Sequence, residues 1–229
     1  MAAKSEVISS IECNQLEPAP SAHFSARWRD LAEIAVVFGF ILAAVWTPQG
    51  KLNAFFSLTA AACVVGLAAT GNWGISQFGL MRPTQGAGLV LLLGALLCMA
   101  VALIGIPLRS FGPGWLVPMH RAWQYVVWAL AQEFILQGIF FVRLESILGS
   151  RRAVLVSAAL FATAHFPSLL LTALSFCGGL VFCEFFPRWR NLYPIGIIHG
   201  ALGLTIAASL PDHWLHHMRV GIGYLTVHS

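Results

Sequence analysis

The sequence predicts an all-α protein, a polytopic transmembrane helical bundle of about seven spans. Three observations predict it: 58% of the 229 residues are hydrophobic, only 10% are charged, and the mean hydropathy is +0.78. These values lie outside the usual range of water-soluble domains. A hydrocarbon core of about 30 Å requires roughly 20 apolar residues per helix, so a chain of this length has room for about seven spans.

The seven expected spans follow one another between helix-breaking segments. The apolar stretches run over 31–46, 52–70, 86–106, 123–148, 153–169, 170–186 and 192–210. Segments rich in proline, glycine or charge separate most of them, at 47–50, 82–83, 107–118, 149–152 and 187–191. The weakest boundary lies near Pro167, which disfavours helix at the residue before it.

The domain organisation expected from this pattern is a polar tail followed by one membrane domain. Residues 1–30 contain charged residues and no apolar run, so no cleavable signal peptide is expected. Residues 31–229 form a single transmembrane helical domain, with a catalytic core at about 121–210. The five cysteines form no CxxC pair, and packing is their expected role.

The basic residues predict the orientation of the bundle. They lie between the hydrophobic stretches and form no patch, so they favour a topology signal over nucleic-acid binding. A cytoplasmic N-terminus puts nine of the thirteen on the inside: Lys4, Arg27, Arg29, Arg82, Arg143, Arg151, Arg152, Arg188 and Arg190. Lys51, Arg109, Arg121 and Arg219 then lie outside.

Three ionisable residues lie within the later apolar stretches: Glu133, His165 and His199. Each costs about 2.5–3.5 kcal/mol to insert into a membrane, so such residues mark functional sites. Singly, each histidine could simply bond a neighbouring helix, and Glu133 could be a protonated acid paired with a nearby glutamine. Together they are the components of a site that activates water.

These residues resemble the motifs of the CPBP intramembrane proteases, the CAAX prenyl endopeptidases and their bacterial relatives. That family carries EExxxR, FxxxH and HxxxN on three separate membrane helices. The matching positions here run from Gln132 and Glu133 to Gln137, from Phe161 to His165, and from His199 to Gly203. The resemblance covers the expected helices four to seven, about the second half of the chain, and implies a peptidase with a CAAX-protease-like core there.

This sequence departs from the family pattern at Gln132, Gln137 and Gly203. Glutamine cannot take a proton from water, so a base would have to be Glu133. The changes nevertheless preserve charge. Two carboxylates and one guanidinium sum to −1, and so do Gln132, Glu133 and Gln137. This balance favours a working enzyme over a decayed one.

The mechanism that the resemblance implies is hydrolysis by a glutamic-type endopeptidase without a metal or other cofactor. Glu133 and His165 would activate water and His199 would stabilise the oxyanion, with Gln132, Gln137, Phe161 and Gly203 in supporting or substrate-binding positions. A zinc site made by Glu133, His165 and His199 is the closest alternative. Asp212, His213, His216 and His217 form a second group, for which a solvated interfacial turn is favoured over a metal site.

The depth of the site indicates the class of substrate. Glu133 lies about 18 Å along its helix from Arg121, which places it between the midplane and the outer leaflet. This favours an exported protein whose C-terminal membrane anchor or sorting tail is cleaved, as in the resembling myxosortase-like branch. The expected surroundings are membrane lipids in the bacterial inner membrane; the oligomeric state is left open. A non-catalytic binding or immunity protein of the same fold is the alternative from another class, and a proton-coupled transporter is disfavoured because no internal repeat is visible.

Overall fold

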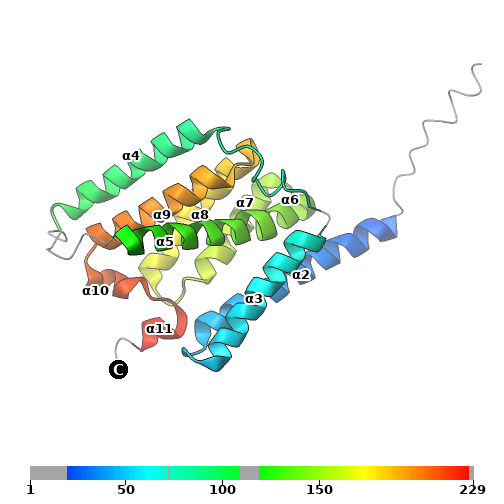
Figure 1. Ribbon diagram of the computed structural model, residues 1–229, viewed down its shortest axis with the longest axis horizontal. Helices are drawn as coiled ribbons and strands as arrows, with labels where there is room; N and C mark the ends of the chain where they lie inside the picture. The colour runs from blue at the N-terminus through cyan, green and yellow to red at the C-terminus, as the bar shows by residue number, and fades with distance from the viewer. Residues whose placement is uncertain (1–19, 72, 109–118, 227–229) are drawn as a thin grey trace, which may run out of the picture.

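The computed structural model describes residues 20–71, 73–108 and 119–226, and every regular element in these ranges is helical. Figure 1 shows a helical bundle, which confirms the predicted fold class. The elements are α2 (Pro20–Trp46), α3 (Lys51–Thr70), α4 (Ala87–Gly105), α5 (Met119–Glu133), the π-helix η1 (Phe134–Phe141), α6 (Val142–Leu148), α7 (Ser150–Thr163), α8 (Leu169–Trp189), α9 (Leu192–Ser209), α10 (Asp212–Leu215), the 3₁₀-helix η2 (His216–Met218) and α11 (Gly221–Leu225).

Five helical stretches in the described ranges are long and apolar enough to cross a membrane. They cover 51–70, 87–105, 122–148, 169–189 and 192–209. The expected spans at 31–46 and 153–169 are not among them. The first lies within a longer helix, α2, which begins at Pro20 and not at residue 31. The last 18 residues of α2 contain three charged residues, Arg29, Asp30 and Glu33, which is too many for a candidate span. The second corresponds to α7, which has only 14 residues.

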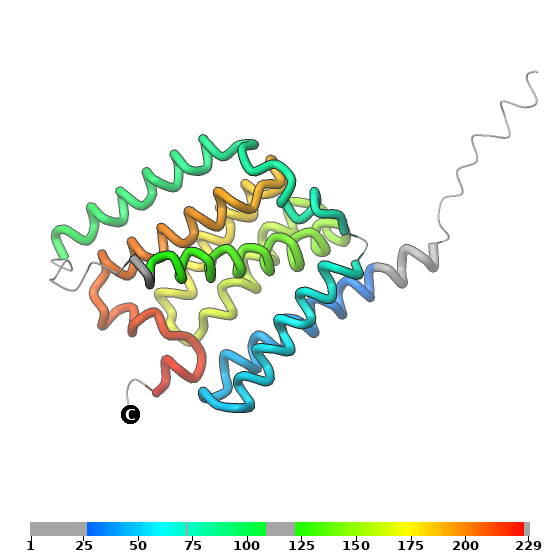
Figure 2. Tube along the Cα trace, viewed as in Figure 1, coloured from blue at the N-terminus to red at the C-terminus, as the bar shows by residue number. Residues whose placement is uncertain are grey.

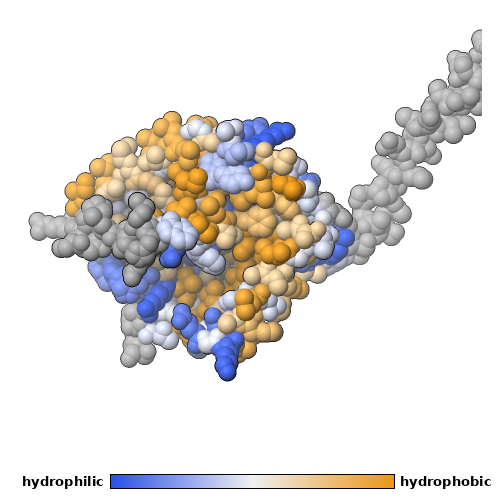
Figure 3. Space-filling model, in the orientation of Figure 1, coloured by the Kyte–Doolittle hydropathy of each residue, from blue (hydrophilic) through white to orange (hydrophobic). Residues whose placement is uncertain are grey.

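The surface of the bundle has the character of a membrane protein. The side of α4 that faces away from the bundle exposes many large apolar side chains: Leu89, Leu91, Leu92, Leu93, Leu96, Leu97, Met99, Leu103 and Ile104. Figure 3 shows this apolar surface over α4, with hydrophilic residues nearer the helix ends. In water such a face would be a large association hazard, whereas lipid tails solvate it at no cost.

The direction of the long helices places the described basic residues unevenly. Following the chain in Figure 2, α2, α3, α4, the α5–α6 stretch, α7, α8 and α9 alternate in direction. The end of the bundle where α2, α4, α7 and α9 begin carries six exposed arginines: Arg27, Arg29, Arg82, Arg151, Arg152 and Arg188. The other end carries Lys51, Arg121 and Arg219 in the described ranges.

Close approach of α9 to its neighbours depends on glycines. A Cβ atom at Gly196 would collide with Leu130 of α5, and one at Gly200 would collide with Val126. Where α9 packs against α4, a Cβ at Gly94 of α4 would collide with Ile198 of α9. These small residues bring backbones together in a medium where helices gain no hydrophobic free energy from association.

A π-helical segment interrupts the central α5–α6 stretch immediately after Glu133. Phe134–Phe141 form η1, and the N–H of Val142 donates to the carbonyl of Gln137, five residues earlier. The wider turn rotates the following residues relative to an unbroken α-helix. Residues 136–144 are all buried as a result. Single π-helical turns of this kind are frequent at functional sites.

Arg143 is fully buried beside η1 and is therefore not one of the flanking topology residues that the sequence suggested. Its Nε donates to Oε2 of Glu33 at 2.7 Å, and its Nη1 donates to the carbonyl of Ile139 at 3.1 Å. Nearby, the hydroxyl of Ser146 donates to Asp30. The charged residues of α2 thus bind α6, which explains why the helix continues through the sequence expected to be a tail.

Removing the guanidinium of Arg143 is expected to destabilise the fold. Arg143→Ala leaves Glu33 without its buried partner, which typically costs about 3–5 kcal/mol. Thermal unfolding in detergent should show a clearly lower midpoint. Arg188→Ala is the matched control, because Arg188 pairs with Glu184 on the exposed surface of α8 and such pairs contribute little. Equal midpoints for the two variants would contradict the structural role of Arg143.

Candidate active site

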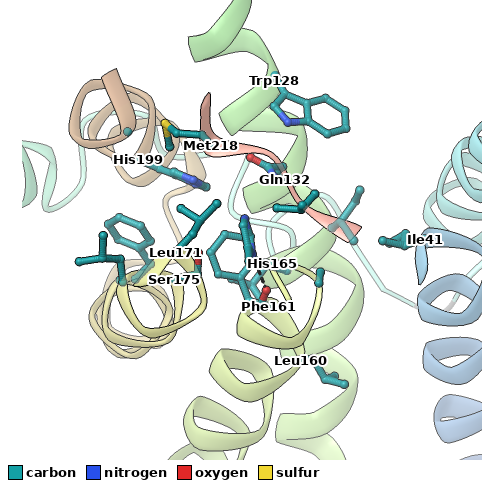
Figure 4. A pocket seen from close by; sticks show the side chains of 18 of the residues that line it. Ile41, Trp128, Gln132, Leu160, Phe161, His165, Leu171, Ser175, His199 and Met218 are labelled. Atoms are coloured by element: carbon teal, nitrogen blue, oxygen red, sulfur yellow. Dashed lines mark hydrogen bonds between the residues drawn. The ribbon is translucent and has the colours of Figure 1, made fainter. Parts of the chain in front are cut away.

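The three residues that the sequence singled out come from three different parts of the fold. Glu133 ends α5, His165 lies between α7 and α8, and His199 lies in the middle of α9. The structure brings Glu133 and His199 into direct contact, with 2.9 Å between Oε1 and Nδ1. Figure 4 shows His165, His199 and Gln132 directed into one cavity from three elements.

Glu133 is fully buried, and both of its carboxylate oxygens are occupied. Oε1 meets His199, and Oε2 accepts from Nε2 of Gln137 at 3.0 Å. This second bond confirms that Gln137 shares a helical face with Glu133. Because the carboxylate does not line the cavity, it lies behind His199 and has no direct access to a water molecule in the cavity. The direct contact with water that the sequence suggested does not fit this geometry, and the catalytic role of Glu133 stays a prediction.

His165 is held in one tautomer by the backbone. Its Nδ1 lies 2.7 Å from the carbonyl oxygen of Phe161, one turn earlier. A carbonyl can only accept, so Nδ1 must carry the proton and the neutral ring keeps its lone pair on Nε2. The Phe161 ring also meets the imidazole edge-on at 4.7 Å between centroids. His165 lines the cavity, so its second nitrogen is the one available for chemistry.

His199 is positioned by two aromatic rings as well as by Glu133. Phe182 of α8 stacks on the imidazole with 5.5 Å between centroids, and Phe161 contacts it edge-on at the same distance. Since Nδ1 is bound to Glu133, Nε2 is the nitrogen left for the cavity, which His199 also lines. Phe161 therefore contacts both imidazoles, and its supporting role stays a prediction.

The cavity has a volume of about 290 Å³ and a mostly apolar wall. It lies between α2, α5, α7, α8, α9 and the segment before α11. Of the seven predicted site residues, five line it: Gln132, Phe161, His165, His199 and Gly203. Glu133 and Gln137 lie in the layer behind. An apolar cavity with a few convergent polar groups is the usual form of a binding site for an apolar ligand or peptide segment.

Two other parts of the cavity wall were not predicted from the sequence. Met218 and Val220, close to the C-terminus, line it from the end of the bundle opposite the arginines. The N–H of Gly221 donates to the carbonyl of Phe166 at 2.9 Å, so this segment holds the loop that carries His165. Tyr125 lines the cavity from α5, where its ring and hydroxyl face Gly203.

No group of three or more His, Cys, Asp or Glu side chains in the described ranges is arranged to hold a metal ion. The second histidine group forms an exposed turn, in which Oδ1 of Asp212 accepts from the backbone N–H of His217 at 2.9 Å. The same oxygen lies 3.0 Å from Nδ1 of His217. Asp212 therefore serves as a local cap, and His213 contacts the Trp214 ring edge-on.

The site thus consists of two imidazoles that face an apolar cavity, one of them backed by a buried carboxylate, within a bundle whose helices are long enough to span a membrane. These are the components of a site that activates water. Residues 113–205 match the family model described as type II CAAX prenyl endopeptidase Rce1-like. The match covers less than half of the chain but includes Glu133, His165 and His199, and it points to a peptidase of the CAAX type. The search of curated proteins and the search of solved structures each found no match.

Proposed function

We propose that this protein is an intramembrane endopeptidase that uses His165, His199 and Glu133 to hydrolyse a peptide bond without a metal. One observation carries the proposal: both imidazoles are anchored through Nδ1 while lining the same apolar cavity. Water is scarce in such a cavity, so a fixed polar group there is costly unless it serves a purpose. The match to a CAAX-type peptidase family over this part of the chain supports the same chemistry.

Charge compensation assigns different roles to the two histidines. Glu133 is fully buried, and its other bonding partner, Gln137, is neutral. We assign the positive charge to His199, whose Nδ1 lies 2.9 Å from Oε1 of Glu133, so that the two side chains form an ion pair. The Nε2–H of His199 then donates into the cavity. We assign the neutral form to His165; its bond to Phe161 then places the proton on Nδ1 and leaves the lone pair on Nε2.

The reaction follows from these two states. Nε2 of His165 accepts a proton from water as the water oxygen bonds to the scissile carbonyl carbon. The carbonyl electron pair moves to oxygen, where the His199 N–H stabilises the resulting negative charge. The carbonyl then re-forms, the C–N bond breaks, and His165 returns the proton to the leaving amine. Gln132, which also lines the cavity, accepts a hydrogen bond from the water and orients it.

The proposed substrate is the C-terminal membrane anchor or sorting tail of an exported protein. Six exposed arginines mark one end of the bundle, which we assign to the cytoplasmic side of a bacterial inner membrane. The cavity is lined from the other end by Val45, Met218 and Val220. A substrate that enters from the outer leaflet reaches the two histidines without crossing the bundle. The apolar wall suits the side chains of an anchor.

Reporter proteins in cells test this substrate class. Two reporters carry the same apolar C-terminal anchor, one with its soluble domain exported and one with the domain in the cytoplasm; a third ends in a farnesylated CAAX sequence. We expect cleavage of the exported reporter alone, detected as a new C-terminus by mass spectrometry. Cells with the His165→Ala variant are the control.

Other outcomes correspond to the alternatives. Cleavage of the farnesylated reporter alone would overturn the proposed substrate but keep the peptidase. Absence of cleavage in all three, with a cellular phenotype unchanged by His165→Ala, would favour a non-catalytic binding or immunity protein. For the purified enzyme we expect cleavage to persist with EDTA, whereas parallel loss of zinc and activity would favour a zinc-dependent peptidase.

A further inference from the structure

A tyrosine outside the family motifs faces the catalytic cavity on the same side as Gln132. Tyr125 precedes Gln132 by seven residues, which is two helical turns, so both project from one face of α5. Trp128 lies between them on this face and also lines the cavity. α5 therefore contributes a row of three side chains to the cavity wall, of which Tyr125 is nearest the end opposite the arginines.

The Tyr125 side chain fills the space that a side chain at position 203 would need. A Cβ atom built at Gly203 would collide with the hydroxyl oxygen of Tyr125 and with two carbons of its ring. Gly203 is the position where the resembling protease family carries asparagine. Glycine there has no side-chain donor, but it makes room for a hydroxyl that comes from the facing helix.

The hydroxyl of Tyr125 is available to a ligand. No residue in the described ranges forms a hydrogen bond with it. Its oxygen is not fully enclosed by protein atoms. Tyr125 also lines the cavity.

Tyr125 and His199 line the same cavity, and the Tyr125 hydroxyl faces α9 at Gly203. Gly203 is one helical turn, about 6 Å, from His199 along α9. Action on one atom requires a substrate carbonyl oxygen that binds between the two positions and accepts from both Nε2–H of His199 and O–H of Tyr125. Tetrahedral intermediates of peptide hydrolysis are commonly stabilised by two such donors.

We infer that Tyr125 is a catalytic residue whose hydroxyl completes the oxyanion hole together with His199. This inference rests on the proposed peptidase function. As water attacks, the O–H of Tyr125 donates a hydrogen bond to the carbonyl oxygen that becomes negative, and the proton stays on Tyr125 throughout. The Tyr125–Gly203 pair thus supplies from α5 the donor that an asparagine on α9 would supply.

Removing only the hydroxyl tests the inference. Tyr125→Phe keeps the ring and is expected to lower kcat for the cleaved reporter peptide by about 10²–10³-fold, the usual effect of losing one oxyanion donor. KM should change little, because the donor acts mainly after attack. Tyr193→Phe is the matched control: this hydroxyl meets the carbonyl of Leu80 on the exposed surface, and its loss should leave kcat unchanged.

A second pair of variants exchanges the donor between helices. Gly203→Asn in the wild-type background should lower the unfolding midpoint, because the new side chain collides with Tyr125. Tyr125→Ala removes the collision, so the double variant Tyr125→Ala/Gly203→Asn should regain stability and at least tenfold in kcat over Tyr125→Ala alone. Full activity of Tyr125→Phe, or no gain in the double variant, would overturn the role of Tyr125.

The outcomes separate this inference from the proposed function. A wild-type protein that cleaves none of the reporters overturns both. If the wild type cleaves and His165→Ala does not, the peptidase stands. In that case Tyr125→Phe alone decides whether the hydroxyl takes part in catalysis.

Discussion

His165→Ala is expected to lower kcat by about 10²–10⁴-fold while leaving the fold intact, because the variant lacks the only neutral imidazole that the proposed mechanism uses as a base. His165 lies in the connection between α7 and α8, and its side-chain hydrogen bond is local, to Phe161 one turn earlier. Its loss therefore leaves the helix contacts in place. Single-turnover cleavage of a reporter peptide, with unfolding midpoints measured in parallel, checks the prediction.

Chemical rescue shows whether His165→Ala is slow because it lacks a base or because its fold has changed. The alanine variant leaves space beside Phe161, and added imidazole should occupy it and restore part of the rate. His213→Ala serves as the matched control, because His213 lies in the exposed turn next to Trp214. Cleavage at the wild-type rate by His165→Ala would contradict the assignment of the base. A large drop in the unfolding midpoint would instead make His165 a structural residue.

The apolar pattern predicts the helices well but not what their charged residues contact. Proline and glycine mark breaks that the structure keeps, such as the one between α7 and α8. Arg143 is an example of a contact that the apolar pattern does not predict. In the sequence it flanks an apolar stretch like any topology residue, whereas in the fold it is buried against Glu33 of α2. That contact joins residues 110 positions apart and cannot be inferred from local pattern.

For the candidate site too, the sequence predicts which residues belong together but not where each side chain points. The order and spacing of Glu133, His165 and His199 indicate a common site. Gln132 and Glu133 are neighbours in sequence, however, and point about 100° apart on a helix. Which of the two faces the cavity depends on how α5 packs against α9, and Gln132 does so. Tyr125 escapes detection for the same reason, because its relation to Gly203 exists only once the two helices meet.

Glu133→Gln is expected to lower kcat by about 10²–10³-fold with KM nearly unchanged, although Glu133 does not touch the cavity. Glutamine has the same shape and can still accept from Nδ1 of His199. It carries no charge, so nothing in the layer behind His199 stabilises an imidazolium. His199 then loses the positive charge that the proposed mechanism directs at the oxyanion.

Nitrogen-15 NMR of labelled histidine tests this positioning role independently of the rate. We expect an imidazolium signal for His199 in the wild type, assigned by its loss in a His199→Gln variant, and a neutral signal in Glu133→Gln. Glu184→Gln is the control, since Glu184 pairs with Arg188 on the exposed face of α8 and should change neither quantity.

Conservative replacement separates charge from packing. Glu133→Asp keeps the carboxylate one methylene farther from His199, so it should retain the imidazolium signal and recover part of the rate lost in Glu133→Gln. A neutral His199 in the wild type would contradict its role as a charged donor. The Glu133–His199 pair would then be the candidate base. Wild-type kcat in Glu133→Gln would reduce the buried acid to a packing group. A slow Glu133→Gln with an imidazolium at His199 would show that the carboxylate acts by orienting the ring, because the charge would then be present and the rate still lost.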